Sequence, residues 1–345
     1  MLLAASALVR LLHLADNPGW DGDEGYNWSI AANLAAGHAQ RFALRYTFVD
    51  HPPLFYLLGA ALFKAWTHDL IALRTLSACC GVLATLGTFA LGARIGGRRL
   101  GLLAAGIYAL WPQAILQTRW AYTYNLVTPL ALFALWAAFA PGGAADDVAH
   151  TPASIRMTLL AGLLAGLALA TDQEAIAVVV TVVLVLWWRG GIRALALGVL
   201  SASVAPALYL LWMLASRGGA FLFDIRHTAT RVGGNGMVEQ ALALVARFVH
   251  LCQFDLLIAF GLYGLLLLPG GLGRRTLLTQ TALLLLVVLE VRDPNPYFRA
   301  ASPLLPFCAI GLGAIAVILW RSLARRVLSS ASVAQGLAAL ALLGT

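Results

Sequence analysis

Acidic residues that could act in catalysis gather in one polar stretch near the start of the chain. Asp21, Asp23 and Glu24 lie close together, and Asp50 and His51 follow in the same stretch. A carboxylate can remove the proton from an attacking hydroxyl group, and carboxylates with a histidine can bind a divalent metal ion. The sequence therefore predicts that residues 16–70 carry out general-base or metal-assisted chemistry.

Most of the remaining chain is apolar. Hydrophobic residues make up 61% of the sequence, charged residues only 11%, and the mean hydropathy is +0.84. Apolar runs in a bilayer must be helical, because lipid offers no hydrogen-bond partner to the backbone. We expect an all-α, polytopic integral membrane protein with about eleven transmembrane helices, within a range of about ten to thirteen. The apolar runs are 1–15, 72–94, 100–117, 122–140, 157–170, 173–188, 194–215, 247–268, 276–291, 303–320 and 331–345.

The net charge of +8 comes from arginines that stand in short clusters between these runs. Such clusters are typical of cytoplasmic loops and not of nucleic-acid binding, so we expect no nucleic-acid partner. The clusters are Arg94/Arg98/Arg99, Arg156, Arg189/Arg193, Arg274/Arg275 and Arg321/Arg325/Arg326. They all fall on one side only if the short segment 53–67 lies at the membrane surface as a juxtamembrane helix. The acidic stretch is then extracytoplasmic.

We expect a single membrane domain over 1–345, with no soluble C-terminal domain. Its extracytoplasmic parts are expected at 16–70, 217–246 and 291–302, of which 217–246 is a lid or a linker. The four cysteines lie in apolar runs without disulfide or zinc-ligand spacing, and we interpret them as packing residues.

Five features occur in a fixed order in the first part of the chain. They are an apolar span, Asp23-Glu24-Gly25-Tyr26, His51-Pro52-Pro53-Leu54, Ala72-Leu73-Arg74 and the arginine-rich turn 94–99. Later, Tyr297-Phe298-Arg299 is followed by Pro303 and Pro306. This order resembles the GT-C membrane glycosyltransferases, in particular the branch of the bacterial aminoarabinose transferases and protein O-mannosyltransferases. The resemblance is strong over about residues 1–140 and weaker afterwards.

The resemblance implies an enzyme of the bacterial cytoplasmic (inner) membrane, with its active site on the extracytoplasmic face. It would transfer a sugar from a polyprenyl-phosphate donor, undecaprenyl phosphate in most bacteria, to a lipid, glycan or protein acceptor. Asp23 matches the catalytic base of the family, and Glu24 would orient it or bind substrate. The alternative is that both acids cap the helix that begins at Gly25, since acids favour a helix N-terminus.

A leaving phosphate needs cations, and guanidinium groups suit phosphate geometry. The candidates are Arg45, Arg74, Arg119, Arg226, Arg231 and Arg299, with His51 as a further substrate-binding residue. Arg119 stands near Tyr122 and Tyr124, and Arg299 near Tyr297; these tyrosines are expected to stack on the sugar. The alternatives are that the arginines extend to lipid headgroups and that the aromatic residues form an interfacial belt.

A divalent ion, Mg, Mn or Zn, is a further expectation. Asp50 directly precedes His-Pro-Pro, where a branch of the family places an acidic metal ligand, and His51 or His227 would complete the site. Asp21 with Asp23 forms an Asp-x-Asp pattern that also binds metals in some glycosyltransferases. The alternative for Asp50 is a turn before the two prolines.

Asp172 and Glu174 interrupt a long apolar run, which makes them candidates for the active site or an ordinary exposed turn. The family often carries a lysine or another polar residue here, so the acids are a departure. A polytopic lipid or solute transporter or flippase is the alternative function. It would predict an internal repeat, and none is evident in the sequence. A non-catalytic scaffold is the third reading, and it makes no use of Asp23.

Overall fold

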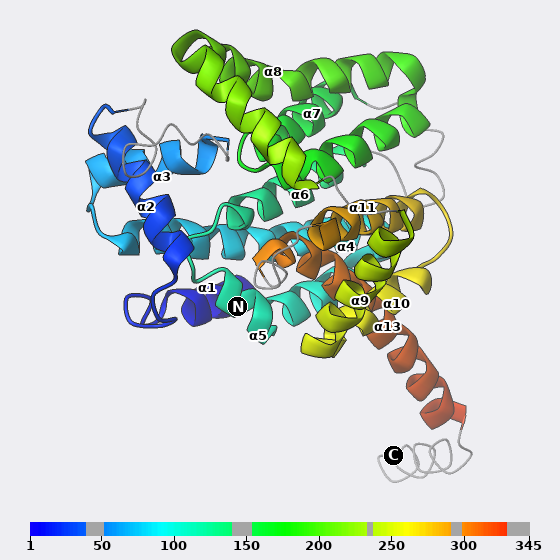
Figure 1. The fold of residues 1–345 in the computed structure, drawn as a ribbon. Helices are drawn as coiled ribbons and strands as arrows, with labels where there is room; N and C mark the ends of the chain where they lie inside the picture. The colour runs from blue at the N-terminus through cyan, green and yellow to red at the C-terminus, as the bar shows by residue number, and fades with distance from the viewer. Residues whose placement is uncertain (39–51, 140–153, 233–236, 291–298, 330–345) are drawn as a thin grey trace.

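The computed structural model describes residues 1–38, 52–139, 154–232, 237–290 and 299–329, and these residues are helical without any strand. The all-α class is therefore confirmed (Figure 1). The helices are α1 (Leu2–Leu11), α2 (Gly22–Ala35), α3 (Leu54–Ala65), α4 (Leu70–Leu110), α5 (Pro112–Gln117), α6 (Tyr124–Ala138), α7 (Ile155–Leu169), α8 (Ile176–Val232), α9 (Met237–Phe254), α10 (Leu256–Leu266), α11 (Leu272–Glu290) and α13 (Leu305–Ser329). Two short 3-10 turns, η2 (Gln173–Ala175) and η3 (Ser302–Leu304), precede α8 and α13.

Several of these helices are long and apolar enough to cross a bilayer. Within the described residues there are four such spans, Leu70–Leu110, Gln173–Ala215, Leu272–Leu289 and Ser302–Ala324. The pair Leu242–Phe254 and Leu256–Leu266, bent by 107°, makes a fifth if it is one span, and α1, α3, α6 and α7 are shorter apolar helices. The protein is thus a multi-pass membrane protein. The expected number of about eleven spans stays a prediction.

Glycines reverse the direction of the long helices at the arginine clusters. In α4 the backbone leaves helical geometry at Gly96 and Gly97, and Gly97 has a φ of 84° that favours glycine. The chain then returns along itself, so closely that a Cβ added to Gly92 would lie 3.1 Å from the Cα of Gly101. Gly191, with a φ of 61°, makes a similar break in α8.

These reversals meet at one end of the helix bundle. The guanidinium carbon of Arg94 lies 5.4 Å from the ring centroid of Trp136 in α6. Arg189 of α8 donates a hydrogen bond to the carbonyl oxygen of Ala138 at 2.6 Å. The start of α11 lies at the same end of the bundle, because Gly273 packs closely against the side chain of Ile95. Three arginine clusters therefore lie at one end of the bundle, as the arginine pattern indicated.

The acidic stretch lies at the other end, where α1 ends and α4 begins. Arg74, in the first turns of α4, donates hydrogen bonds to the carbonyl oxygens of Leu14 at 3.2 Å and Gly19 at 3.0 Å. The chain therefore enters and leaves the stretch between α1 and α4 at the same end of the bundle. α2 and α3 pack against each other there (Figure 1), and their position at the membrane surface stays a prediction.

Two regions differ from the sequence expectation. The region 217–246 is mostly helical, because α8 continues to Val232 with a break at Gly218 and α9 begins at Met237. Apolar residues stabilise this helix; the ring of Phe221 packs edge-on against Tyr209 with centroids 6.1 Å apart. The run 247–268 is bent at Asp255, which accepts a hydrogen bond from the indole of Trp111 at 2.6 Å.

Small residues allow the late helices to approach closely. A Cβ on Gly311 of α13 would lie 1.9 Å from the carbonyl oxygen of Gly261 in α10, and one on Gly264 would lie 2.1 Å from the carbonyl oxygen of Gly311. In a bilayer, helices associate largely through such close backbone packing, because lipid tails are as apolar as the side chains. This contact fixes α13, and with it the segment that precedes it.

Candidate active site

The candidate site is built on the N-terminus of α2. Asp21 is the N-cap residue, and its carboxylate accepts a hydrogen bond from the backbone N–H of Asp23 at 2.9 Å. Glu24 reaches back to the N–H of Asp21 at 3.4 Å, which completes a capping box. The side chain of Asp23 is 61% exposed. Capping therefore uses Asp21 and Glu24, and Asp23 faces outward.

Glu24 is fully buried and acts as a structural anchor. Its carboxylate accepts two hydrogen bonds from Arg74, at 2.9 Å and 2.6 Å, and one from the backbone N–H of Ala121 at 2.8 Å. These contacts tie α2 to α4 and to the segment before α6. Asn27, one turn further along α2, adds a hydrogen bond to the carbonyl oxygen of Ala121 at 2.7 Å. Glu24 thus fixes the first turn of α2, from which Asp23 extends, and its expected role toward Asp23 stays a prediction.

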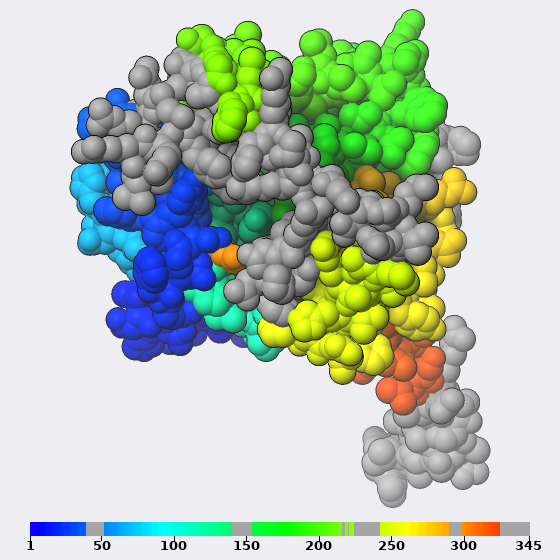
Figure 2. All heavy atoms as spheres, viewed as in Figure 1, coloured from blue at the N-terminus to red at the C-terminus, as the bar shows by residue number. Residues whose placement is uncertain are grey.

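Arg299 pairs with the exposed acids across the length of the chain. Its Nη1 forms an ion pair with Asp23 and lies 3.5 Å from the carboxylate of Asp21. Burial opposes the charge of Arg299, but these carboxylates outweigh it and raise the pKa of its guanidinium. The segment that leads into η3 (orange) reaches the surface beside α2 (blue) in Figure 2. Asp23 and Arg299 are hereafter called the Asp23–Arg299 pair.

Tyr122 lies beneath this pair. The guanidinium carbon of Arg299 lies 5.6 Å from the centroid of its ring, and the carboxylate of Asp21 lies within electrostatic range of its hydroxyl group. Burial first, and then the charge of Asp21, raise the pKa of Tyr122 well above its ordinary value. The phenol is therefore a neutral hydrogen-bond donor at physiological pH. The guanidinium of Arg299 lies over the face of the Tyr122 ring, so Tyr122 can position this cation.

A second acidic group lies nearby at the turn between α7 and α8. Asp172 accepts a hydrogen bond from the hydroxyl group of Thr123 at 2.7 Å and caps η2 through the N–H of Glu174 at 3.1 Å. Glu174 is only 6% exposed, and its Oε2 atom has no hydrogen-bond partner among the described residues. Tyr124 is within electrostatic range of both this turn and the Asp23–Arg299 pair. Residues 157–188 thus form two helices joined by an acidic turn.

Two predicted phosphate ligands have their donors engaged by the protein itself. Arg119 is buried and donates to carbonyl oxygens at and after the end of α1; these belong to Val9, Arg10, Leu12, His13 and Asn17. Arg74 binds Glu24 and four carbonyl oxygens of the segment 14–19. The sequence pattern did not reveal this structural use. By contrast, Nε and Nη2 of Arg299 donate to no other described residue.

Arg10 is a buried polar residue that the sequence analysis did not single out. It is fully buried in α1 and donates hydrogen bonds to Thr118 at 3.0 Å and to the carbonyl oxygen of Ala109 at 3.0 Å. Its position inside an apolar run was the available signal, because a charged residue there must find partners. It fastens α1 to the segment that carries Arg119.

An open groove of about 610 Å³ runs along α1 and α5. Apolar residues line most of it, and His13, Asn17 and Arg119 form its polar part. Arg119 donates a hydrogen bond to the carbonyl oxygen of Asn17, and Arg74, which binds Glu24, donates one to that of Pro18, so the polar part of the groove lies close to the anchor of α2.

Four predicted site residues, Arg45, Asp50, His51 and Tyr297, lie outside the described residues, and so do the side chains of the further candidates Arg226, His227 and Arg231. The described part of the chain contains no group of three His, Cys, Asp or Glu side chains that could hold a metal ion. Asp21 and Asp23 both pair with Nη1 of Arg299, so this cation lies where the Asp-x-Asp pattern would place a metal ion. The described residues therefore do not by themselves form the expected metal site.

No protein-family model and no curated protein matches the chain. Solved structures do match. The apo structure of ArnT from Cupriavidus metallidurans is 18% identical, with a TM-score of 0.65 over 97% of this chain and 62% of ArnT. The structure of the same ArnT bound to undecaprenyl phosphate gives 19% identity and a TM-score of 0.63, over 97% and 63% of the two chains.

A third similar structure is the archaeal oligosaccharyltransferase AglB from Archaeoglobus fulgidus, in complex with an inhibitory peptide and a dolichol-phosphate. It is 15% identical, with a TM-score of 0.53 over 94% of this chain and 51% of AglB. The chain thus spans less than two thirds of the length of either protein. Both have the GT-C fold, and at these identities the fold is the shared property. The chain therefore has the GT-C fold.

Proposed function

We propose that this protein is a membrane glycosyltransferase that transfers a sugar from a polyprenyl-phosphate donor to an extracytoplasmic lipid, glycan or protein acceptor. One observation carries the proposal: an exposed carboxylate, Asp23, lies beside a cation with unused donors, Arg299, on a GT-C fold. The similar structures add support, since ArnT was solved with undecaprenyl phosphate and AglB with a dolichol-phosphate. In a bacterium the donor would be undecaprenyl-linked, and the membrane would be the inner membrane.

In the proposed reaction Asp23 is the general base. It removes the proton from the acceptor nucleophile as the new bond to the anomeric carbon forms. The bond from the anomeric carbon to the phosphate oxygen breaks, and the polyprenyl phosphate leaves with the electron pair. Arg299 stabilises the charge that develops on the leaving phosphate, through the two donors that no described residue uses.

The ion pair suggests an order of events in this proposal. While Arg299 is bound to Asp23, its guanidinium occupies a carboxylate oxygen that would otherwise accept the proton of the nucleophile. A donor phosphate competes for Arg299 and releases Asp23 to accept a proton. Donor binding would thus activate the base. The apolar groove along α1 and α5 would hold the first part of the polyprenyl chain, and its polar part would lie toward the site.

Glu24 acts in this proposal through Asp23, whose helix it anchors. Tyr122 contacts Arg299 through its ring, and Tyr124 is within electrostatic range of both the Asp23–Arg299 pair and the acidic turn, so the sugar would lie against these two tyrosines. A divalent ion at Asp50, with His51, stays a prediction, although a structure of the Archaeoglobus fulgidus oligosaccharyltransferase contains Zn. Since the described residues do not form such a site, no step is assigned to the ion.

The test is sugar transfer in reconstituted vesicles. Radiolabelled polyprenyl-phosphate sugars are supplied to the wild type, to Asp23→Asn and to Asp16→Asn, an exposed acid of the same stretch that serves as the matched control. We expect Asp23→Asn to lose at least about a hundredfold in rate, as for removal of a general base, with donor binding retained. Equal rates in Asp23→Asn and the wild type would refute the role of Asp23. Movement of the labelled lipid across the vesicle membrane without product would favour a flippase.

A further inference from the structure

Arg99 and Arg321 carry charges that the proposed reaction does not use. They lie at the end of the bundle opposite the Asp23–Arg299 pair. α13 begins at Leu305, shortly after Arg299, and Arg321 follows sixteen residues later, roughly 24 Å along the helix. Arg99 directly follows the reversal of α4 at Gly97. Both side chains are exposed, and neither forms a hydrogen bond or ion pair with another described residue.

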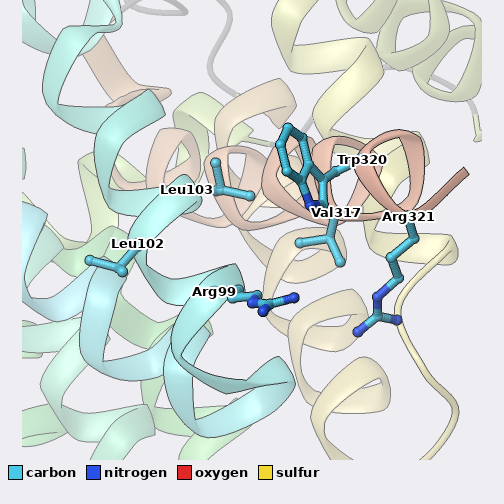
Figure 3. A pocket seen from close by; sticks show the side chains of 6 residues that line it. All are labelled: Arg99, Leu102, Leu103, Val317, Trp320 and Arg321. Carbon is cyan, nitrogen blue, oxygen red and sulfur yellow. The ribbon is translucent and has the colours of Figure 1, made fainter. Parts of the chain in front are cut away.

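The two arginines border a cleft between α4 and α13. Its volume is about 430 Å³, and it is lined by Arg99, Leu102, Leu103, Val317, Trp320 and Arg321. Figure 3 shows both guanidinium groups extending toward the same side of the cleft, while Leu103 and Trp320 lie toward the other. The cleft is therefore polar at one end and apolar at the other.

This polarity matches the depth of the residues in a membrane. Along α4 the chain runs from the turn into the bundle, so Leu103 lies about 6 Å deeper than Arg99. Along α13 the chain runs outward, so Val317 lies about 6 Å deeper than Arg321. Two helices thus place an arginine at the same level, with apolar residues one turn further into the bilayer. A lipid has the same order, with its phosphate at the surface and its chains below.

The charge of this region calls for an anionic partner. The sequence of the elements that meet here, 91–110, 267–275 and 305–324, contains no Asp or Glu, whereas it holds Arg94, Arg98, Arg274 and Arg275 in addition to the two cleft arginines. Guanidinium groups bind phosphate through paired donors, and two of them can share one phosphate. Trp320 is 68% exposed and suits the interfacial region of a bilayer.

We propose that this cleft is a binding site for an anionic phospholipid. The phosphate lies on Arg99 and Arg321, and one acyl chain runs along Leu103, Val317 and Trp320. The lipid would join α4 to α13 at the end of the bundle that we predict to be cytoplasmic. This site is separate from the proposed donor groove along α1 and α5, so either proposal can fail without the other.

Native mass spectrometry of the full chain in a mild detergent tests the site. The purified protein is delipidated and titrated with phosphatidylglycerol or with phosphatidylcholine of the same chains. We expect preferential binding of phosphatidylglycerol by the wild type. Arg99→Gln combined with Arg321→Gln should bind it about thirtyfold more weakly, at about 1 kcal/mol for each arginine. Arg98→Gln, which removes an exposed arginine outside the cleft, should bind it as the wild type does.

Three results would overturn the proposal. They are equal binding of the two lipids, an equal loss of binding in Arg98→Gln, and full displacement of the lipid by millimolar inorganic phosphate, which would identify free phosphate as the ligand. A second measurement does not depend on the arginine variants. Phosphatidylglycerol with brominated chains should quench fluorescence in the wild type more than in Trp320→Phe, and equal quenching would place the chain elsewhere. Melting temperatures of all variants without lipid confirm that the compared proteins are folded.

Discussion

The Glu24→Gln variant separates the structural use of the first acidic residues from their chemical use. Glu24 is fully buried and accepts two hydrogen bonds from Arg74 and one from the N–H of Ala121. Glutamine keeps the acceptor oxygen but turns an N–H₂ group toward a donor of Arg74, and the charge of Arg74 loses its counter-ion. Breaking a buried ion pair in this way costs about 3–5 kcal/mol.

The lower part of that range applies here, because four backbone carbonyl oxygens continue to accept hydrogen bonds from Arg74. We therefore expect Glu24→Gln to lower the free energy of unfolding by about 3 kcal/mol and the melting temperature by roughly 4 °C. Asp23→Asn, at an exposed position, should change stability by less than about 0.5 kcal/mol. Glu24→Gln is thus expected to change the stability of the protein, whereas Asp23→Asn is not.

A thiol-reactive fluorophore measures this difference in detergent. Cys80 and Cys308 are buried, so they react only as the protein unfolds, whereas the exposed Cys79 gives a constant background. The expected result is an early transition for Glu24→Gln and a wild-type transition for Asp23→Asn. If Glu24→Gln melted like the wild type and yet lost sugar transfer, Glu24 would act in the chemistry itself, and the structural interpretation would be refuted.

Three further predictions follow from buried contacts. Arg119→Gln should lower stability by about 2–4 kcal/mol without changing the donor KM, because its donors bind backbone carbonyls; a raised KM in the folded variant would instead support phosphate binding. Gly311→Ala should sharply reduce the yield of folded protein, since its Cβ would meet the backbone of Gly261, whereas Gly106→Ala has open space and should be tolerated. Burial and a neighbouring carboxylate raise the pKa of Tyr122, so its neutral form is favoured in the folded state. The stability that it contributes should be complete below about pH 10 and decline above it, and melting curves between about pH 8 and 11 should decline less steeply for Tyr122→Phe than for the wild type.

Sequence alone could predict much of the fold. Apolar runs and arginine clusters predicted helices that reverse at the clusters, and the glycines at 96, 97 and 191 lie at these reversals. The bend at Asp255 could not be predicted, because a single acid at the edge of an apolar run has the same local pattern in a straight span and in a bent one. Its indole partner, Trp111, is far away in the sequence.

The same reasoning explains which site residues could be recognised. Capping by Glu24 could be predicted because its pattern is local, but the helix begins at Gly22 and not Gly25, so its cap is Asp21 and not the predicted Asp23. The engagement of Arg74 and Arg119 was not, because a guanidinium near a membrane edge has the same sequence context whether its donors meet carbonyl oxygens or a phosphate. Only the folded chain brings the carbonyl oxygens of segment 9–19 to these two side chains.

The Asp23–Arg299 pair joins residues 276 positions apart, and this has a consequence for biogenesis. At about 5–20 residues per second, a ribosome needs roughly 14–55 seconds to reach Arg299 after Asp23 has been made. During that time α2 already stands at the membrane surface with its carboxylate but without its cation. The proposed enzyme therefore cannot act on a lipid-linked sugar until the segment before α13 has been inserted, so an incomplete nascent chain is inactive toward the donors that surround it.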